Sequence, residues 1–110
     1  MSSSDRELLE LAAKAIGINV RWHDGGYYGP TMEIMECEAG GSPWNPLTDD
    51  GDAFRLMLAL QIDVSFWRED DSVCVSIHQN LIATAVGAIG DIELRRAIVR
   101  AAAEIGRSMP

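Results

Sequence analysis

Apolar residues near the start of the chain recur with the period of an amphipathic helix. They repeat every three or four positions over Leu8–Ile16, and Gly17 supplies a left-handed stop. Ser4 and Glu7 have the spacing of a capping box, in which each residue satisfies the backbone amide of the other. The pattern therefore predicts a helix that begins at Ser4 and ends at Gly17.

Two extended segments follow this helix. Apolar and polar residues alternate over Ile18–Trp22, which predicts a strand buried on one side. A second strand is expected over Thr31–Glu38, although its apolar residues lie on both faces. The glycine-rich segments His23–Gly26 and Gly40–Pro43 are typical of a turn and a loop. These four segments predict a first pair of strands.

A second pair of strands is expected to form a hairpin, because alternation is clear over residues 62–67 and again over residues 73–78. A slip of one residue would place apolar positions opposite polar ones, so the register is fixed by the pattern. A turn at Arg68–Asp71 gives the matching register. The predicted facing pairs are Phe66 with Val73, Val64 with Val75, and Ile62 with Ile77.

Two further helices complete the pattern. An apolar helix is expected over Ala53–Gln61, and an amphipathic helix is expected from about Ile92 to a stop at Gly106. The inner face of the last helix would hold Leu94, Ala97, Ile98, Ala101 and Ile105, and the outer face Arg95, Arg96, Arg100 and Glu104.

The uncharged segment Leu81–Gly90 has no clear period, so a buried connection, a short extra strand and a contact surface remain alternatives. The resulting fold class is α+β, with three helices packed on a mostly antiparallel sheet of about four strands, in the order α-β-β-α-β-β-α. A chain of 110 residues has room for one core. We expect residues 1–3 to be a disordered N-terminus and residues 4–110 to be a single domain.

Composition narrows the classes of function. Hydrophobic residues make up 47% and charged residues 24% of the chain, which is typical of a globular protein. No apolar run is long enough for a membrane helix, and a cytoplasmic location is expected. The net charge of −8 disfavours direct nucleic-acid binding and favours either simple solubility or a basic protein partner. Cys37 and Cys74 are expected to be reduced thiols.

The segment WNPLTDDGDAF, Trp44–Phe54, is the densest cluster of carboxylates in the chain. It lacks the spacing and the closing glutamate of a calcium loop. Asp49 fits a helix N-cap and Asp52 the third helical position, while Gly51 leaves room for another backbone. A functional carboxylate cluster is the alternative. Asp50 has no role in the capping interpretation and is therefore a candidate partner contact.

Other candidate contacts come from aromatic and charged residues. Trp44 is expected to pack on the core or to form a lid, with recognition as the alternative. The polar face of the hairpin carries Trp67, Cys74 and His78, but Cys74 and His78 are about 13 Å apart on one strand and form no direct catalytic dyad. No catalytic, cofactor-binding or metal-binding residue is predicted. The candidates for partner binding are Tyr27, Tyr28, Trp44, Asp50, Trp67, Glu69, Asp70, Asp71 and His78.

Two blocks of the sequence resemble a known group of proteins. The segments Trp44–Ala53, WNPLTDDGDA, and Arg95–Gly106, RRAIVRAAAEIG, resemble small proteins of tailed phages and prophages of the NinX-like, or phage αβα-sandwich, group. The likeness covers about half of the chain. It implies an α/β sandwich and a phage origin, and it carries over no catalytic residues.

Three functional hypotheses follow. The leading one is a non-enzymatic phage or prophage accessory protein that binds a host or phage protein in the host cytoplasm, with inhibition of host defence, such as an anti-CRISPR activity, as one form. The second is a small-molecule or nucleotide-binding protein that uses the polar sheet face around Trp67 and His78. The third is an unrecognised enzymatic activity built on the carboxylates Asp49, Asp50 or Asp52. A homodimer, formed through the last helix or Leu81–Gly90, is compatible with each of them.

Overall fold

The structure is a computed structural model, and it describes residues 3–23, 31–37, 40–69, 72–77, 80–86 and 90–110. Five of the predicted partner-binding residues lie outside these ranges, namely Tyr27, Tyr28, Asp70, Asp71 and His78. The predicted turn at His23–Gly26 also falls largely outside them.

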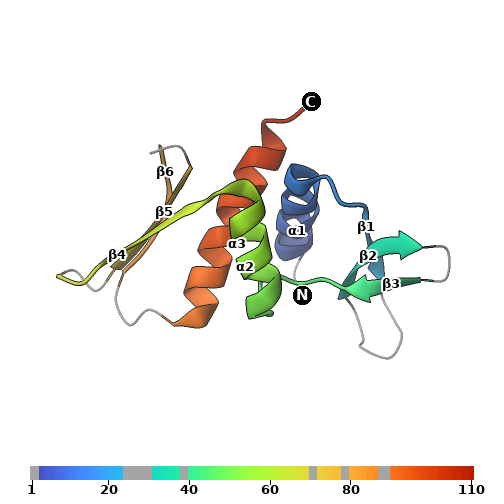
Figure 1. The fold of residues 1–110 in the computed structure, drawn as a ribbon, viewed down its shortest axis with the longest axis horizontal. Coiled ribbons are helices and arrows are strands. Elements are labelled where there is room, and N and C mark those ends of the chain that lie inside the picture. Colours follow the sequence, from blue (N-terminus) through green and yellow to red (C-terminus); the bar gives the residue numbers. More distant parts are fainter. Residues whose placement is uncertain (1–2, 24–30, 38–39, 70–71, 78–79, 87–89) are drawn as a thin grey trace.

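Three helices occupy the middle of the molecule, and a small antiparallel sheet lies on each side of them (Figure 1). The helices are α1 (Ser3–Ile16), α2 (Asp50–Leu60) and α3 (Asp91–Arg107). The first sheet has the order β1-β2-β3, with β1 at Val20–His23, β2 at Thr31–Cys37 and β3 at Gly40–Pro43. The second has the order β4-β5-β6, with β4 at Asp63–Trp67, β5 at Ser72–Ile77 and β6 at Asn80–Val86.

The α+β class and the alternation of helices with groups of strands are confirmed. The strands are divided between two sheets, and each predicted strand pair gains a third strand. Gly40–Pro43, predicted as a loop, is β3 and pairs with β2. The segment that begins at Leu81 contributes the short extra strand β6, which pairs with β5. Neither added strand has a clear alternation of apolar and polar residues. Backbone pairing with a neighbouring strand, and not a side-chain pattern, therefore places them in a sheet.

The register predicted for the hairpin is confirmed. Phe66 faces Val73 and Val64 faces Val75, while the pairing of Trp67 with Ser72 leaves four connecting residues. Ile62 lies immediately before β4, where the same register continues with Asp63 opposite Ser76. Matching two apolar stripes was therefore sufficient to align these strands.

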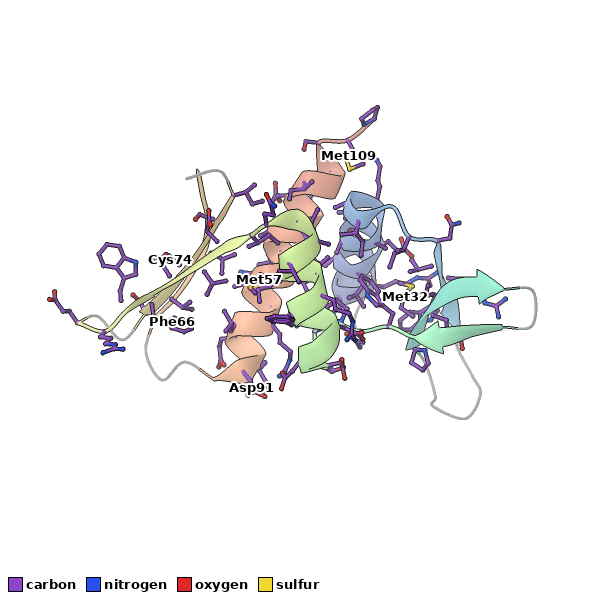
Figure 2. All side chains as sticks on the ribbon, in the orientation of Figure 1. Met32, Met57, Phe66, Cys74, Asp91 and Met109 are labelled. Carbon is purple, nitrogen blue, oxygen red and sulfur yellow. The ribbon has the colours of Figure 1, made fainter. Side chains whose placement is uncertain are left out.

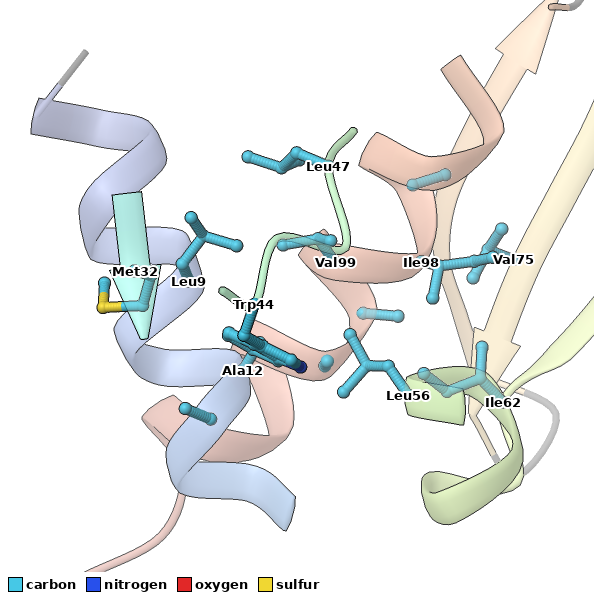
Figure 3. Close-up of a cluster of buried hydrophobic side chains, with 14 residues drawn as sticks. Leu9, Ala12, Met32, Trp44, Leu47, Leu56, Ile62, Val75, Ile98 and Val99 are labelled. Carbon is cyan, nitrogen blue, oxygen red and sulfur yellow. The ribbon is translucent and has the colours of Figure 1, made fainter. Parts of the chain in front are cut away.

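The hydrophobic core lies between the helices and extends to both sheets (Figure 3). Trp44, which precedes α2, packs in it with only 4% of its surface exposed, and its backbone amide donates a 2.8 Å hydrogen bond to the Met32 carbonyl of β2. Trp44 thereby links the first sheet to the helices. The buried side chains around it include Leu9, Ala12, Leu56, Ile98 and Val99.

The predicted stop at Gly106 is wrong, because α3 continues to Arg107 and is capped by Ser108. Gly106 is buried where α1 crosses α3, and a Cβ atom placed on it would lie 2.0 Å from the Leu11 carbonyl oxygen. A glycine is needed here for close approach of two helices and not for a left-handed turn. Gly17 does adopt the predicted left-handed conformation after α1, with φ 74°.

The first helix begins at Ser3, one residue earlier than predicted, so Ser4 lies inside the helix and not at its cap. Among the described residues, no helix is both long enough and apolar enough to cross a membrane.

Candidate functional site

The carboxylates of the segment at the start of α2 are held by backbone and side-chain partners. Asp49 is the N-cap, with extended backbone, and its Oδ2 accepts a 2.8 Å hydrogen bond from the Asp52 amide. Asp52 is the third helical residue, as predicted, and its Oδ2 accepts a 2.9 Å hydrogen bond from the Asn45 amide. Arg55 donates from Nη2 to the other oxygen of Asp52 at 2.8 Å. The capping interpretation is confirmed.

The space that Gly51 leaves is bordered by side chains and not by another backbone. The atoms nearest to an added Cβ are the guanidinium of Arg55 and a carboxylate oxygen of Asp49, at 3.2 Å each. Both side chains are more than half exposed, so the first turn of α2 faces solvent at this position.

Asp50, the acid without a role in the sequence interpretation, forms an ion pair with Arg95 of α3. Arg95 Nη1 lies 2.6 Å from Asp50 Oδ1 and 2.8 Å from Asp91 Oδ2, and Arg95 Nε donates a 2.9 Å hydrogen bond to the Leu47 carbonyl. The prediction that Arg95 faces outward is therefore wrong, since its side chain is 11% exposed. It faces inward because three acceptors at the starts of α2 and α3 satisfy its guanidinium.

These ionic contacts also shift the pKa values of Asp91 and Arg95. The hydrogen bond from Arg95, together with its positive charge, holds the pKa of Asp91 below its ordinary value of 3.8. The same bonds to Asp91 and Asp50 raise the pKa of Arg95. Asp91 and Arg95 are consequently ionised throughout the physiological range. We call residues Trp44–Asp52 with Asp91 and Arg95 the helix-start junction.

Two of the predicted partner-binding residues, Trp44 and Asp50, belong to the helix-start junction. Trp44 is buried in the core, so the alternative of recognition by an exposed tryptophan is wrong for this residue. Asp50 remains accessible, with 81% of its side chain exposed, although one of its oxygens is bound to Arg95.

Beside the helix-start junction lies an open groove of about 470 Å³ that sequence reasoning missed. Figure 2 shows Met57 on α2, Phe66 on β4 and Asp91 at the beginning of α3, which mark its three sides. The apolar groove, as we call it, is lined by Ala53, Phe54, Met57, Val64, Phe66, Leu94 and Ile98, with Asp50, Asp91 and Arg95 at one end.

The shape of the apolar groove follows from the chain between α2 and β4. Gln61 adopts a left-handed conformation, φ 53°, that ends α2, and the next residue, Ile62, is buried. From this point α2 and β4 diverge, and α3 lies behind the space between them (Figure 1). Leu94 and Ile98 of α3 line the space between the two diverging elements.

Two phenylalanines on opposite sides of the groove are largely uncovered. Phe54 of α2 is 57% exposed and Phe66 of β4 is 65% exposed. Phe66 was expected on the inward stripe of the hairpin, and it does share a face with Val64, but this end of β4 extends beyond α3. Leaving two large rings in water costs free energy that burial by a ligand or partner would recover.

A sequence signal for this groove exists in the composition of α2. The helix sequence DGDAFRLMLAL carries apolar residues around most of its circumference. A helix of that kind needs more than one apolar neighbour, yet only Ala53 and Leu56 are fully buried. Of the remaining apolar residues, Met57 and Leu60 are partly buried against the core, and Phe54, Leu58 and Ala59 are exposed.

The other predicted contacts are scattered. Trp67 is 57% exposed on the face of β4 opposite to Phe66, and Glu69 is exposed in the following turn. Cys74 is partly buried on β5 opposite Ser65 and is not in a disulfide bond. Across the described parts of the chain, no three histidine, cysteine or carboxylate side chains are arranged to hold a metal ion.

Comparisons with known proteins found no matching family model, no matching curated protein and no matching solved structure. The resemblance to the NinX-like phage group therefore stays a hypothesis.

Proposed function

We propose that this protein is a non-enzymatic accessory protein that acts by binding another protein through the apolar groove. The observation that carries the proposal is the pair of exposed rings, Phe54 and Phe66, facing a groove whose other walls are also apolar. Large exposed apolar side chains gathered around one depression are typical of an interaction surface. Following the sequence resemblance, the partner belongs to a phage or its host, and inhibition of host defence is the specific role to test.

The charge of the chain supports a protein partner over a nucleic acid. The net charge is −8, and the two charged residues at the mouth of the groove that face solvent are carboxylates, Asp50 and Asp91. A phosphate backbone would be repelled at this surface, whereas a basic protein would be attracted.

A capture experiment with matched variants tests the proposal. The baits are the wild type, the double variant Phe54→Ser/Phe66→Ser, and the control Leu58→Ser, which removes an exposed apolar residue of α2 that does not line the groove. We expect quantitative mass spectrometry to find a partner that wild type and Leu58→Ser recover and the double variant loses. Equal recovery by all three baits would contradict the proposal.

The host-defence role has its own readout. Cells with an active CRISPR system are challenged with a targeted phage while they express each of the same three proteins. The proposal predicts that wild type and Leu58→Ser raise plaque counts and that the double variant does not. Unchanged plaque counts with every protein would remove the host-defence role and leave partner binding to be judged by capture.

The size of the groove favours one alternative of a different class. A volume of about 470 Å³ with mostly apolar walls falls within the range of small-molecule sites. A thermal-shift screen separates the two functions, because a ligand present at 100 times its dissociation constant adds about 2.7 kcal/mol of stability. A compound that stabilises wild type but not Phe54→Ser/Phe66→Ser would favour the small-molecule function.

A further inference from the structure

The strands of the second sheet differ in their contacts with the helices. Its strands β5 and β6 contact α3, and β4 runs from the end of α2 past α3 (Figure 1). Among the described residues, β4 pairs with β5 along one edge, and no strand pairs with its other edge. Every residue of β4 except Val64 is exposed, and Val64 is partly buried. The apolar groove thus lies beside an uncovered strand edge.

A fourth strand added along that edge would extend the sheet over α2. Adjacent strands are spaced by about 4.8 Å, and alternate side chains of an added strand point to the same face as Val64 and Phe66. These side chains would contact Phe54 and Met57 of α2, which line the opposite wall. Backbone pairing would satisfy the edge of β4, and side-chain contact would cover the rings.

The charges at the mouth of the groove define the chemistry of that strand. Asp50 and Asp91 have 81% and 71% of their side chains exposed, and Arg95, which contacts one oxygen of each, is 11% exposed. Solvent therefore meets two carboxylates and little of the guanidinium. Lysine or arginine in an incoming segment would complement these groups.

A second copy of this chain fits this surface poorly. Pairing of two β4 edges would bring together two chains that each carry a net charge of −8. Chains that carry the same high net charge repel each other. The charge pattern favours a basic segment of a different protein.

We infer that the partner contributes an extended basic segment that pairs as a fourth strand with β4, with alternate apolar side chains in the groove and a lysine or arginine near Asp50 and Asp91. This inference rests on the proposed function and specifies how the groove is occupied.

The probe is a set of twelve-residue peptides selected from a random display library on the immobilised wild-type protein. Selected sequences are expected to carry an excess of lysine and arginine and to alternate apolar with other residues. Selection of peptides without either feature would overturn the inference. One selected peptide is then synthesised for binding measurements by calorimetry.

Backbone methylation separates strand pairing from other modes of binding. In a paired strand only every second amide points at the neighbouring strand. Two versions of the peptide are N-methylated at odd or at even positions. We expect one version to lose at least tenfold in affinity and the other to bind nearly as well as the parent. Equal binding, or equal loss, by both versions would overturn the strand mode.

The charge contact is tested with a matched pair of variants. Asp50→Asn removes a carboxylate at the mouth of the groove, and Glu104→Gln removes an exposed carboxylate near the other end of α3. We expect Asp50→Asn to weaken the peptide by about 3- to 5-fold, the size of an exposed ion pair, and Glu104→Gln to change it less than 2-fold. Equal effects would overturn the assignment of a basic residue to this end.

Hydrogen exchange locates the peptide and keeps the two proposals distinguishable. Protection of β4 amides in the bound protein supports strand pairing. Binding that is lost in Phe54→Ser/Phe66→Ser without protection of β4 would retain the groove as the binding site and overturn the strand mode. Protection of β4 amides without peptide, together with a doubled mass in sedimentation, would show that the protein dimerises through β4. That result would overturn the basic partner in favour of a second copy.

Discussion

The helix-start junction and the apolar groove share Asp50, Asp91 and Arg95. The two regions differ in whether their other side chains have partners within the protein. In the helix-start junction Asp49, Asp52 and Arg95 each have partners within 3.0 Å. In the apolar groove, Phe54 and Phe66 remain largely in water. The charged groups of the helix-start junction are thus held by structural contacts, and the two exposed rings of the apolar groove are available for binding.

This difference shows why a carboxylate cluster is a weak guide to function. Carboxylates at a helix start are stabilised by the helix dipole and by exposed amides, so folding alone accounts for their presence. Exposed phenylalanines gain nothing comparable from the fold. Variants of each region therefore separate a contribution to stability from a contribution to binding.

The largest effect is expected at the tryptophan of the helix-start junction. Trp44→Ala should lower the free energy of unfolding by about 4 kcal/mol, because it leaves a cavity where the first sheet meets the helices. Urea unfolding followed by circular dichroism measures the loss. The control is Trp67→Ala, whose ring is exposed and whose removal should cost about 1 kcal/mol or less. Similar losses in both variants would remove the core role of Trp44.

Arg95→Met should have the next largest effect and lower the free energy of unfolding by about 2 kcal/mol. The variant keeps most of the buried stem but leaves the Leu47 carbonyl without its donor and places Asp50 near Asp91 without a cation. Arg100→Met, on an exposed position of the same helix, is the matched control and should change unfolding by less than about 0.5 kcal/mol. If both variants unfold at the same urea concentration, Arg95 does not join the helices.

The N-cap should have a smaller effect. Asp49→Ala removes the acceptor for the Asp52 amide and should cost about 1 kcal/mol. Thermal unfolding against Asp63→Ala, an exposed aspartate outside any cap, measures the difference. A melting temperature of Asp49→Ala equal to that of the wild type would contradict the capping role.

The acid dependence of stability provides a test by pH. The folded pKa of Asp91 lies below 3.8, so its contribution is present above the unfolded pKa and is lost as the pH falls through the folded value. Wild type should therefore lose stability below about pH 4 more steeply than Asp91→Asn. Unfolding midpoints at pH 7, 4, 3 and 2 measure both slopes, and parallel curves would show that Asp91 is not the group responsible.

How much the sequence predicted depends on the range of the interactions. The N-cap at Asp49 and the hairpin register were predictable because they depend on residues close in the chain or on two matched stripes. Arg95 and Gly106 were misassigned because their environments come from α2 and α1, far away in sequence. Helical period places a residue on a face but does not reveal which neighbour covers it.

The apolar groove escaped prediction for the same reason. Phe54 and Phe66 each belong to an apolar pattern that is compatible with burial. Their exposure follows from the course of β4 away from α2, which begins at the left-handed Gln61 and the buried Ile62. An alternating pattern cannot show how far a strand extends beyond the helix that it covers.

The most direct test of this division is the free energy of unfolding of Phe54→Ser/Phe66→Ser, measured by urea titration beside the wild type and Leu58→Ser. Phenylalanines kept for binding are dispensable for the fold, so we predict that the double variant stays within about 1 kcal/mol of Leu58→Ser. A loss of about 4 kcal/mol, equal to that expected of Trp44→Ala, would show that the two rings belong to the core and would contradict the account.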